Sequence, residues 1–568
     1  MSSESSDLAF DLTEQPWIPV LRADGSDDAV SLRDLFHQAT DIRRLVGDVP
    51  TQDFALLRLL LAILHDAIDG PQDIDDWQEL WNSSDLPTDA ISAYLDEHRD
   101  RFDLLHPSVP FLQTAGLRTS KDEVFPLDRL AADVPNGELF FTMRANGVDR
   151  LDFAEAARWV VHAHAFDTSG IKTGAAGDTR VKSGKVYPLG VGWAGNLGGV
   201  IVEGDSLRET LLLNLIGFEA PGMRKPDRGL DRPAWRQDPT GPGQRAVLEL
   251  AHRPYGLRDL YTWQSRRIRL HFDGDGVHGV VLGYGDPLSP VNLHDREPMT
   301  VWRRSPAQEK KLSKSTVYLP REHDVTRSAW RGLGALVAGR VEGHDQRAEA
   351  ASIVRPGVLD WVERLTVEGD LEPDMMIRAR LVSAVYGTQQ SVIDEIIDDS
   401  VSMRLVLLRD RDTRLGQTAI NAVSDADTAA RLLGDLAANI ATAAGADPDP
   451  AREAAKTLAY ASLDEPFRQW LAELHVGDEP EARRLEWQRQ AYMLANSLAG
   501  DLIRDMPEAA WDGRVITTKK GKELWLNAAS ADLIFRRTLR KALPGPAATG
   551  TDVAEPSVTD NVPVQESA

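Results

Sequence analysis

Residues 418–444 read TAINAVSDADTAARLLGDLAANIATAA, and this stretch marks the change of texture that decides the fold class. Its apolar side chains recur at helical spacing on a background rich in alanine and leucine. Three similar segments follow, at 449–474, 479–504 and 522–543. Turn sequences such as GADPDP and VGDEP separate the segments, so we expect residues 401–543 to form an up-down four-helix bundle.

The first 400 residues mix helical and extended patterns. Residues 53–68 are apolar around most of a helix circumference and predict a buried helix. Ser206 and Glu209 have the spacing of a capping box and predict a short helix that runs to Leu215. Strand-like runs lie at 267–272, 277–282 and 377–386. We therefore expect an α+β protein, with a large mixed α/β domain over residues 1–400 followed by the bundle.

Length and composition narrow the class of protein. At 568 residues the chain exceeds one hydrophobic core, and the absence of cysteine excludes disulfides and thiolate-ligated metal sites. Its N-terminus lacks a secretory signal and its longest apolar run is too short to span a bilayer, so we expect a cytoplasmic protein with no membrane partner. Residues 544–568 hold almost no large apolar side chain and predict a disordered tail.

The net charge of -24 is unfavourable for binding phosphates over about 8 to 10 Å. Basic residues are nevertheless clustered in RKPDRGLDRPAWR from Arg224, RRIRLH from Arg266, WRRSPAQEKKLSK from Trp302 and RRTLRK from Arg536. Local basic patches of this kind can bind phosphate groups even though the net charge of the whole protein repels them.

The stretch FDTSGIKTGAAGDTRVKSGKVYPLGVGWAGNLGG, residues 166–199, holds nine glycines with Lys172, Arg180, Lys182 and Lys185 among them. A backbone with so few side chains can approach a phosphate-bearing ligand closely, which indicates a nucleotide or a nucleic acid. A glycine-rich connection between strands without any ligand is the third interpretation.

The nucleotide interpretation rests on Gly190, Gly192 and Gly195, which satisfy G-x-G-x-x-G. Pro188 precedes the motif and the strand-like NLGGVIVEG follows it, whereas a dinucleotide site needs a strand before and a helix after. We therefore expect no cofactor.

A metal-dependent hydrolase is the alternative function, built on His162, His164 and Asp167 in HAHAFD. The preceding FAEAARWVV is helical in pattern, and positions i and i+2 of a helix point about 200° apart, so one metal cannot easily take both histidines. Otherwise we expect ordinary surface histidines. The P-loop, H-E-x-x-H and G-x-S-x-G motifs are absent from the sequence, which indicates a protein that is not an enzyme.

Several separated segments occur in the order found in one family: QPWIPV at 15–20, HPSVPFLQTAGL from His106, the glycine stretch with RETLLLNLI, DPLSP at 286–290 and AVYGTQQSVID from Ala384. Over residues 10–543 the chain resembles the CasA family, the large subunits of the type I-E Cascade complex of CRISPR immunity. The resemblance implies a non-catalytic subunit that recognises the protospacer-adjacent motif in double-stranded DNA through the minor groove and starts strand separation and R-loop formation.

The resemblance also assigns residues to DNA binding. It implies a glycine loop formed by Gly170, Ile171, Lys172, Thr173 and Gly174, and a wedge formed by Gln389 and Gln390. Arg296 stands where the family has a lysine finger, with Arg303, Arg304 and Lys310 as competing positions.

Further partners follow from the same resemblance. The segment LAADVPNGELFFTMRA implies contact with the 5′ handle of the guide RNA and docking on a neighbouring Cascade subunit through Phe140 or Phe141. Cleavage is implied to belong to a helicase-nuclease recruited in trans.

Overall fold

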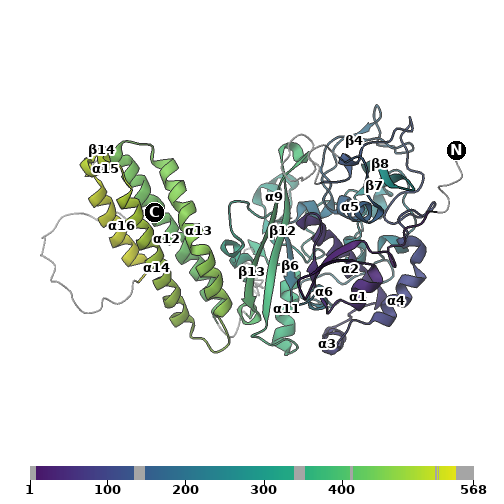
Figure 1. Cartoon of the computed structure of the whole chain (residues 1–568), viewed down its shortest axis with the longest axis horizontal. Coiled ribbons are helices and arrows are strands. Elements are labelled where there is room, and N and C mark those ends of the chain that lie inside the picture. Colours follow the sequence, from purple (N-terminus) through teal and green to yellow (C-terminus); the bar gives the residue numbers. More distant parts are fainter. Residues whose placement is uncertain are drawn as a thin grey trace. The chain divides into compact units, whose positions relative to one another are not determined.

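A computed structural model describes residues 8–132, 148–337, 352–409, 414–517, 521 and 523–544. The chain divides into two compact units, which are described separately below (Figure 1). The first unit takes the chain up to Ile420 together with Arg468–Pro480, and the second takes Asn421–Phe467 and the chain from Glu481 onward. Nearly all of the tail expected at 544–568 lies outside the described residues.

The first unit contains an antiparallel three-stranded sheet in the order β13-β12-β6. Its strands are β6 (Gly199–Glu203), β12 (Met376–Tyr386) and β13 (Ile393–Arg404). The long strands β12 and β13 form one ribbon whose turn lies between Tyr386 and Ile393. The strand predicted at 377–386 is therefore confirmed, and so is the strand expected after the glycine stretch.

Smaller sheets and ribbons surround this sheet. They are β2-β1-β3 (β1, Ile18–Arg22; β2, Asp27–Val30; β3, Ile42–Leu45), β10-β9-β11 (β9, Trp302–Arg304; β10, Tyr318–Pro320; β11, Ile353–Val354), the ribbon β4 (Lys172–Thr173) with β5 (Lys185–Val186), and the ribbon β7 (Arg266–Asp273) with β8 (Gly276–Tyr284). The last pair contains the strands predicted at 267–272 and 277–282, which are confirmed.

The helices of this unit are α1 (Leu32–His37), α2 (Pro50–Ala67), α3 (Ile74–Asn82), α4 (Thr88–Glu97), α5 (Phe153–Phe166), α6 (Leu207–Asn214), α7 (Val247–Leu250), α8 (Leu257–Tyr261), α9 (Pro306–Leu312), α10 (Gly334–Val337) and α11 (Gly357–Glu368). Helix α2 packs against α5, α8 and β12, and almost all of its residues are buried, as predicted.

Buried charges on α2 have charged partners on distant segments. Asp53 accepts a hydrogen bond from Arg380 Nη2 of β12 at 2.9 Å, and Arg58 donates to both carboxylate oxygens of Glu297 at 2.8 Å. These paired charges tie the central helix to β12 and to the segment before β9.

The short helix predicted after Ser206 is confirmed as α6. Ser206 Oγ accepts from the Glu209 amide at 3.2 Å, as an N-cap should. Glu209 Oε2 accepts from the amide of Asp205 at 2.7 Å, one residue earlier than in a standard capping box.

The second unit contains most of α12 (Leu415–Ala444), of α13 (Pro448–Glu473) and of α14 (Pro480–Arg504), together with α15 (Glu508–Asp512), α16 (Ala528–Ala542) and the hairpin β14 (Arg514–Thr517) and β15 (Glu523–Leu526). The long helices lie side by side in Figure 1, and hydrogen bonds join α12 to α13, α12 to α14 and α14 to α16. Alanine at 491, 495 and 499 lets α14 pack closely along one buried face. The α+β class with a helical C-terminal region is thereby confirmed.

One boundary of the expected bundle is wrong. The fourth segment was expected to be helical from residue 522, but β15 occupies Glu523–Leu526 and α16 begins only at Ala528. Asn527 starts this helix because its side chain accepts from the Ser530 amide in a full capping box. None of the helices within the described ranges is long and apolar enough to cross a membrane.

Candidate nucleic-acid interface

A charge cluster holds the base of the β4-β5 ribbon. Asp167, the C-cap of α5, accepts from Lys172 Nζ at 2.8 Å and also from Arg266 Nε. Arg266 Nη2 donates in addition to the carbonyl oxygens of Asp167 at 2.9 Å and Gly190 at 3.0 Å. Three basic and acidic side chains from different segments therefore fix where the glycine stretch leaves α5.

The electrostatics of this cluster are those of an internal site. Burial raises the pKa of Asp167, but the neighbouring Lys172 and Arg266 outweigh it and hold the pKa below its usual value. Burial lowers the pKa of Lys172. Lys172 is consequently a structural cation, whereas Lys182 and Lys185 are exposed on the ribbon.

The other basic residues near the ribbon are also internally paired. Arg180 pairs with Asp178 at 2.9 Å and donates to the Tyr284 carbonyl at 2.6 Å. Arg266 and Arg267 are almost fully buried, so the expectation that RRIRLH forms a surface patch is wrong. Arg266 pairs with Asp167 and Arg267 with Asp286, so these two arginines serve the interior.

Most glycines of the stretch have an internal role. A Cβ atom at Gly174 would lie 2.7 Å from both methyl carbons of Val181, one at Gly192 would lie 2.5 Å from the Ala165 carbonyl carbon, and one at Gly195 would lie 2.2 Å from Tyr386 Oη. Close packing within the protein therefore explains these glycines, which include Gly192 and Gly195 of the G-x-G-x-x-G pattern. Sequence reasoning attributed them to a ligand because these contacts form only in the folded chain, as between Gly195 and the distant Tyr386.

Gly170 is different. Its φ of +127° is one that L side chains rarely adopt, and a Cβ there would meet Ser391 only at ordinary contact distance, 3.8 Å. Tyr284 Oη donates to the Gly170 carbonyl at 2.6 Å, which fixes the entry of the ribbon from β8. Ile171 follows with 58% of its surface exposed.

The predicted glutamine wedge lies directly beside this entry. Gln389 and Gln390 form the turn between β12 and β13, both with positive φ, 57° and 56°, and both are exposed. The Ser169 amide donates to the Gln390 carbonyl at 2.7 Å. Two segments that lie far apart in the sequence, the ribbon entry and the glutamine turn, are thus hydrogen-bonded neighbours.

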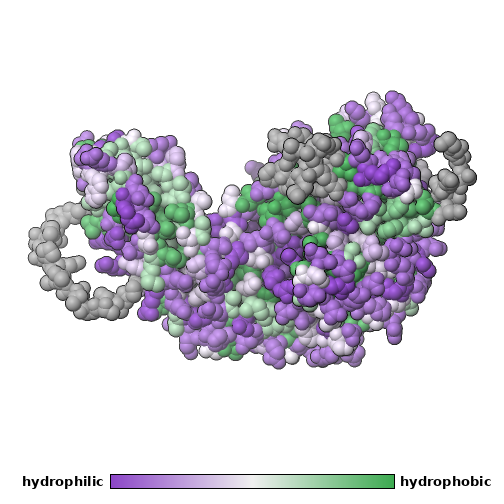
Figure 2. Space-filling view, in the orientation of Figure 1, coloured by the Kyte–Doolittle hydropathy of each residue, from purple (hydrophilic) through white to green (hydrophobic). Residues whose placement is uncertain are grey.

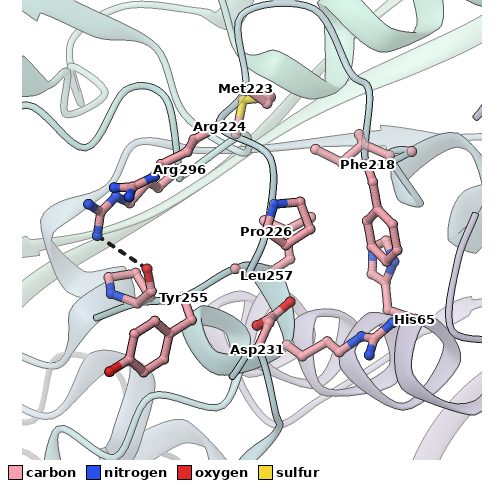
Figure 3. A pocket seen from close by; sticks show the side chains of 14 residues that line it. His65, Phe218, Met223, Arg224, Pro226, Asp231, Tyr255, Leu257 and Arg296 are labelled. Carbon is pink, nitrogen blue, oxygen red and sulfur yellow. Dashed lines mark hydrogen bonds between the residues drawn. The ribbon is translucent and has the colours of Figure 1, made fainter. Parts of the chain in front are cut away.

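Arg296 belongs to another cluster, shown in Figure 3. Its Nη1 donates to the Pro254 carbonyl at 3.2 Å, and its side chain lies with Arg224 at the edge of a small pocket that also contains His65 and Asp231. Partial burial lowers the pKa of Arg296.

The competing basic positions differ in their exposure and ion pairing. Arg303 on β9 and Lys310 on α9 are exposed, whereas Arg304 pairs with Glu309 at 2.7 Å. Phe140 and Phe141, expected to contact RNA or a neighbouring subunit, lie outside the described residues.

The histidines of the alternative hydrolase do not form a metal site. Both histidines lie on α5, but their rings bind different partners. His162 Nε2 is hydrogen-bonded to Thr51 Oγ1 at 2.9 Å, and His164 Nε2 is hydrogen-bonded to the Leu112 carbonyl at 2.8 Å. Burial lowers the pKa of each to about 4, which corrects the expectation of surface histidines. Within the part of the chain that the structure describes, no group of three potential ligands could hold a metal ion.

Sequence reasoning assigned no role to Tyr187, which is 63% exposed on the ribbon. The signal was the alternation Lys185-Val186-Tyr187, which predicts that residues 185 and 187 share a face opposite to buried Val186.

Known proteins share this fold and much of this sequence. A profile for CRISPR-associated protein Cse1 matches residues 11–498. A curated relative, CRISPR-associated protein CasA/Cse1 of Thermus thermophilus, is 30% identical over 350 residues, so the match spans 60% of this chain and 63% of that relative. The crystal structure of Thermobifida fusca Cse1 is 61% identical with a TM-score of 0.87, covering 94% of this chain and 98% of that one.

Cse1 from Acidimicrobium ferrooxidans is 32% identical with a TM-score of 0.78, covering 94% of this chain and 98% of that one. A chain of a CRISPR RNA-guided surveillance complex has the same fold at 18% identity, with a TM-score of 0.67 and coverage of 94% and 99%. Because the profile covers most of its length, the chain belongs to the Cse1 family of CRISPR-associated proteins, which confirms the resemblance to CasA.

Proposed function

We propose that this chain is the non-catalytic large subunit of an RNA-guided CRISPR surveillance complex. In this role it recognises the protospacer-adjacent motif in double-stranded DNA through the minor groove and starts strand separation. The guide RNA reads the sequence, and a helicase-nuclease recruited in trans cleaves. Membership of the Cse1 family and the fold shared with a surveillance-complex chain support the assignment.

The observation that carries the proposal is the hydrogen bond between Ser169 and Gln390. It joins the ribbon entry, where Gly170 has no side chain and Ile171 is exposed, to a turn that presents two amide side chains. The minor groove is only about 6 Å wide, so bare backbone can enter it, and a guanine amino group protruding there would collide with the ribbon. The adjacent glutamines are then positioned to insert at the first base pair and hydrogen-bond the exposed edges.

Charge determines the side from which DNA approaches. Lys182 and Lys185 are exposed on the ribbon, whereas β13 continues from the turn with Asp394 and Glu395. Phosphates therefore lie on the ribbon side. With a net charge of -24, we expect the isolated chain to bind DNA weakly, with a slope of about -0.9 in log K against log salt for each phosphate contact.

Other partners complete the proposal. Phe140 or Phe141 contacts the guide RNA 5′ handle or a neighbouring subunit, and Arg296 is the basic finger, with Arg303 and Lys310 as the exposed alternatives. Copurification with the other subunits, followed by extraction of bound RNA, tests the assembly.

The wedge is tested with glycine rather than alanine, because glycine accepts the positive φ of both positions and so removes the side chains without straining the turn. In the assembled complex, Gln389→Gly with Gln390→Gly should slow R-loop formation on intact duplex and be rescued on a substrate already unpaired at the first position. Unstacking one step costs a few kcal/mol, which the amides offset.

The control is Gln389→Asn with Gln390→Asn, since asparagine tolerates positive φ and keeps the amides. It should retain more duplex activity than the glycine variant. Equal defects on duplex and unpaired substrates would assign the glutamines to folding or docking, and a normal duplex reaction by the glycine variant would refute the wedge.

A further inference from the structure

The β4-β5 ribbon has an inward and an outward face. Lys172 points inward to Asp167, and its cross-strand partner Val186 is buried. Successive side chains of a strand alternate between faces, so Ile171, Lys185 and Tyr187 share the outward face. Exposure agrees, with 58% of Ile171 and 63% of Tyr187 accessible to solvent.

The two apolar side chains lie at the same end of the ribbon. Lys172 is paired with Val186, which places Ile171 just before and Tyr187 just after the paired residues. This is the end at which Ser169 is hydrogen-bonded to Gln390. We call Ile171 and Tyr187 together the ribbon platform, and it adjoins the glutamine turn. Figure 2 shows hydrophobic side chains at the surface near β4.

Exposed cations lie along the ribbon, whereas the acidic Asp394 and Glu395 lie on β13 beyond the glutamine turn that the ribbon platform adjoins. Lys182 and Lys185 are exposed on the same ribbon, and Arg129 Nη1 donates to Thr173 Oγ1 at 2.8 Å. A held backbone, an exposed aromatic ring and neighbouring cations are the combination with which proteins stack unpaired bases and hold the attached phosphates. A purely apolar protein partner would not favour these cations.

We propose that the ribbon platform stacks on a nucleobase that is exposed when the duplex opens beside the glutamine turn, with Tyr187 as the stacking ring. The inference rests on the proposed function. The glutamines separate the first base pair, and Tyr187 stabilises the opened state by stacking on one of the two separated bases.

The test uses the assembled complex and target duplexes with 2-aminopurine at the first protospacer position of either strand. Permanganate reactivity should show that the parent complex opens the duplex. Stacking on tyrosine quenches 2-aminopurine, so the probe on the strand whose base stacks on Tyr187 should gain little fluorescence on opening. Tyr187→Leu, which keeps apolar bulk but removes the ring, should brighten that probe and weaken retention of the opened state roughly 5- to 150-fold. Tyr187→Phe should behave like the parent.

Trp525→Leu is the matched control, because it removes an aromatic residue of similar exposure, 55%, from the second unit. It should leave both probes unchanged. If Tyr187→Leu leaves the probe fluorescence and the retention of the opened state unchanged, Tyr187 does not stack on a base. If the Tyr187→Leu chain no longer assembles into the complex in the absence of DNA, the ribbon platform serves subunit docking instead. Failure of the parent complex to open motif-bearing duplex would instead refute the proposed function itself.

Discussion

Replacing Asp167 by asparagine tests how the ribbon is held. The carboxylate is 10% exposed and lies 2.8 Å from Lys172 Nζ, and the side chain of its second cation, Arg266, is 2% exposed. Asp167→Asn leaves two buried cations without a counter-charge. Breaking a buried pair in this way costs about 3–5 kcal/mol.

The cost should be local, so hydrogen exchange of peptides covering residues 168–192 is the appropriate assay. At tenfold per 1.4 kcal/mol, exchange in this segment should be roughly 100- to 4000-fold faster in Asp167→Asn, while α14 in the other unit is unchanged. Adding Lys172→Met removes one orphaned cation, so the double variant should be better protected than Asp167→Asn alone.

The pH dependence has a definite sign. Because the folded-state pKa of Asp167 is lowered, the stabilisation that its carboxylate gives the fold is complete above the ordinary pKa near 3.8 and is lost as the pH falls through the lowered pKa.

Two outcomes of the exchange experiment would refute this account of Asp167: strictly additive effects of Asp167→Asn and Lys172→Met, or an Asp167→Asn ribbon as well protected as that of the parent.

Three further predictions concern the first unit. Gly174→Ala should destabilise the ribbon by about 1–3 kcal/mol through overpacking on Val181, and Val181→Ala should restore most of this in a urea unfolding series. Burial lowers the pKa of His162 to about 4, so the unfolded chain takes up a proton on this ring at a higher pH than the folded chain does. The free energy of unfolding should therefore fall by about 3 kcal/mol between pH 6.5 and pH 4 because of this residue, and His162→Gln should flatten the pH dependence in that range. Glu297→Gln should cost about 3–5 kcal/mol in the same assay because Arg58 stays buried without its counter-charge, and an effect below 1 kcal/mol would contradict this.

Local patterns were sufficient for much of the fold. The apolar circumference of residues 53–68, the Ser206 cap and the run 377–386 each specify their own element, and each is confirmed. The β14-β15 hairpin was missed because the short run Glu523–Leu526 becomes a strand by pairing with β14 rather than by its own periodicity.

The candidate site depends on contacts that no local pattern reveals. Lys172 looked available in the sequence, but Asp167 and the distant Arg266 make it internal. Gly195 looked like part of a ligand cradle, but Tyr386 packs against it. In both cases the deciding partner comes from a segment far along the chain, brought near only by tertiary packing.

The most direct test of the central claim is photocrosslinking from a benzophenone-bearing side chain placed at position 171 in the assembled complex. Ile171 is exposed beside the glutamine turn, so the substitution has little packing cost, and position 248 on α7, where Leu248 is 82% exposed, is the matched control. The account predicts motif-dependent crosslinks from position 171 to the base pairs of the protospacer-adjacent motif, and none from position 248. A complex that binds motif-bearing duplex tightly but crosslinks to it from neither position, or equally from both, would contradict the account.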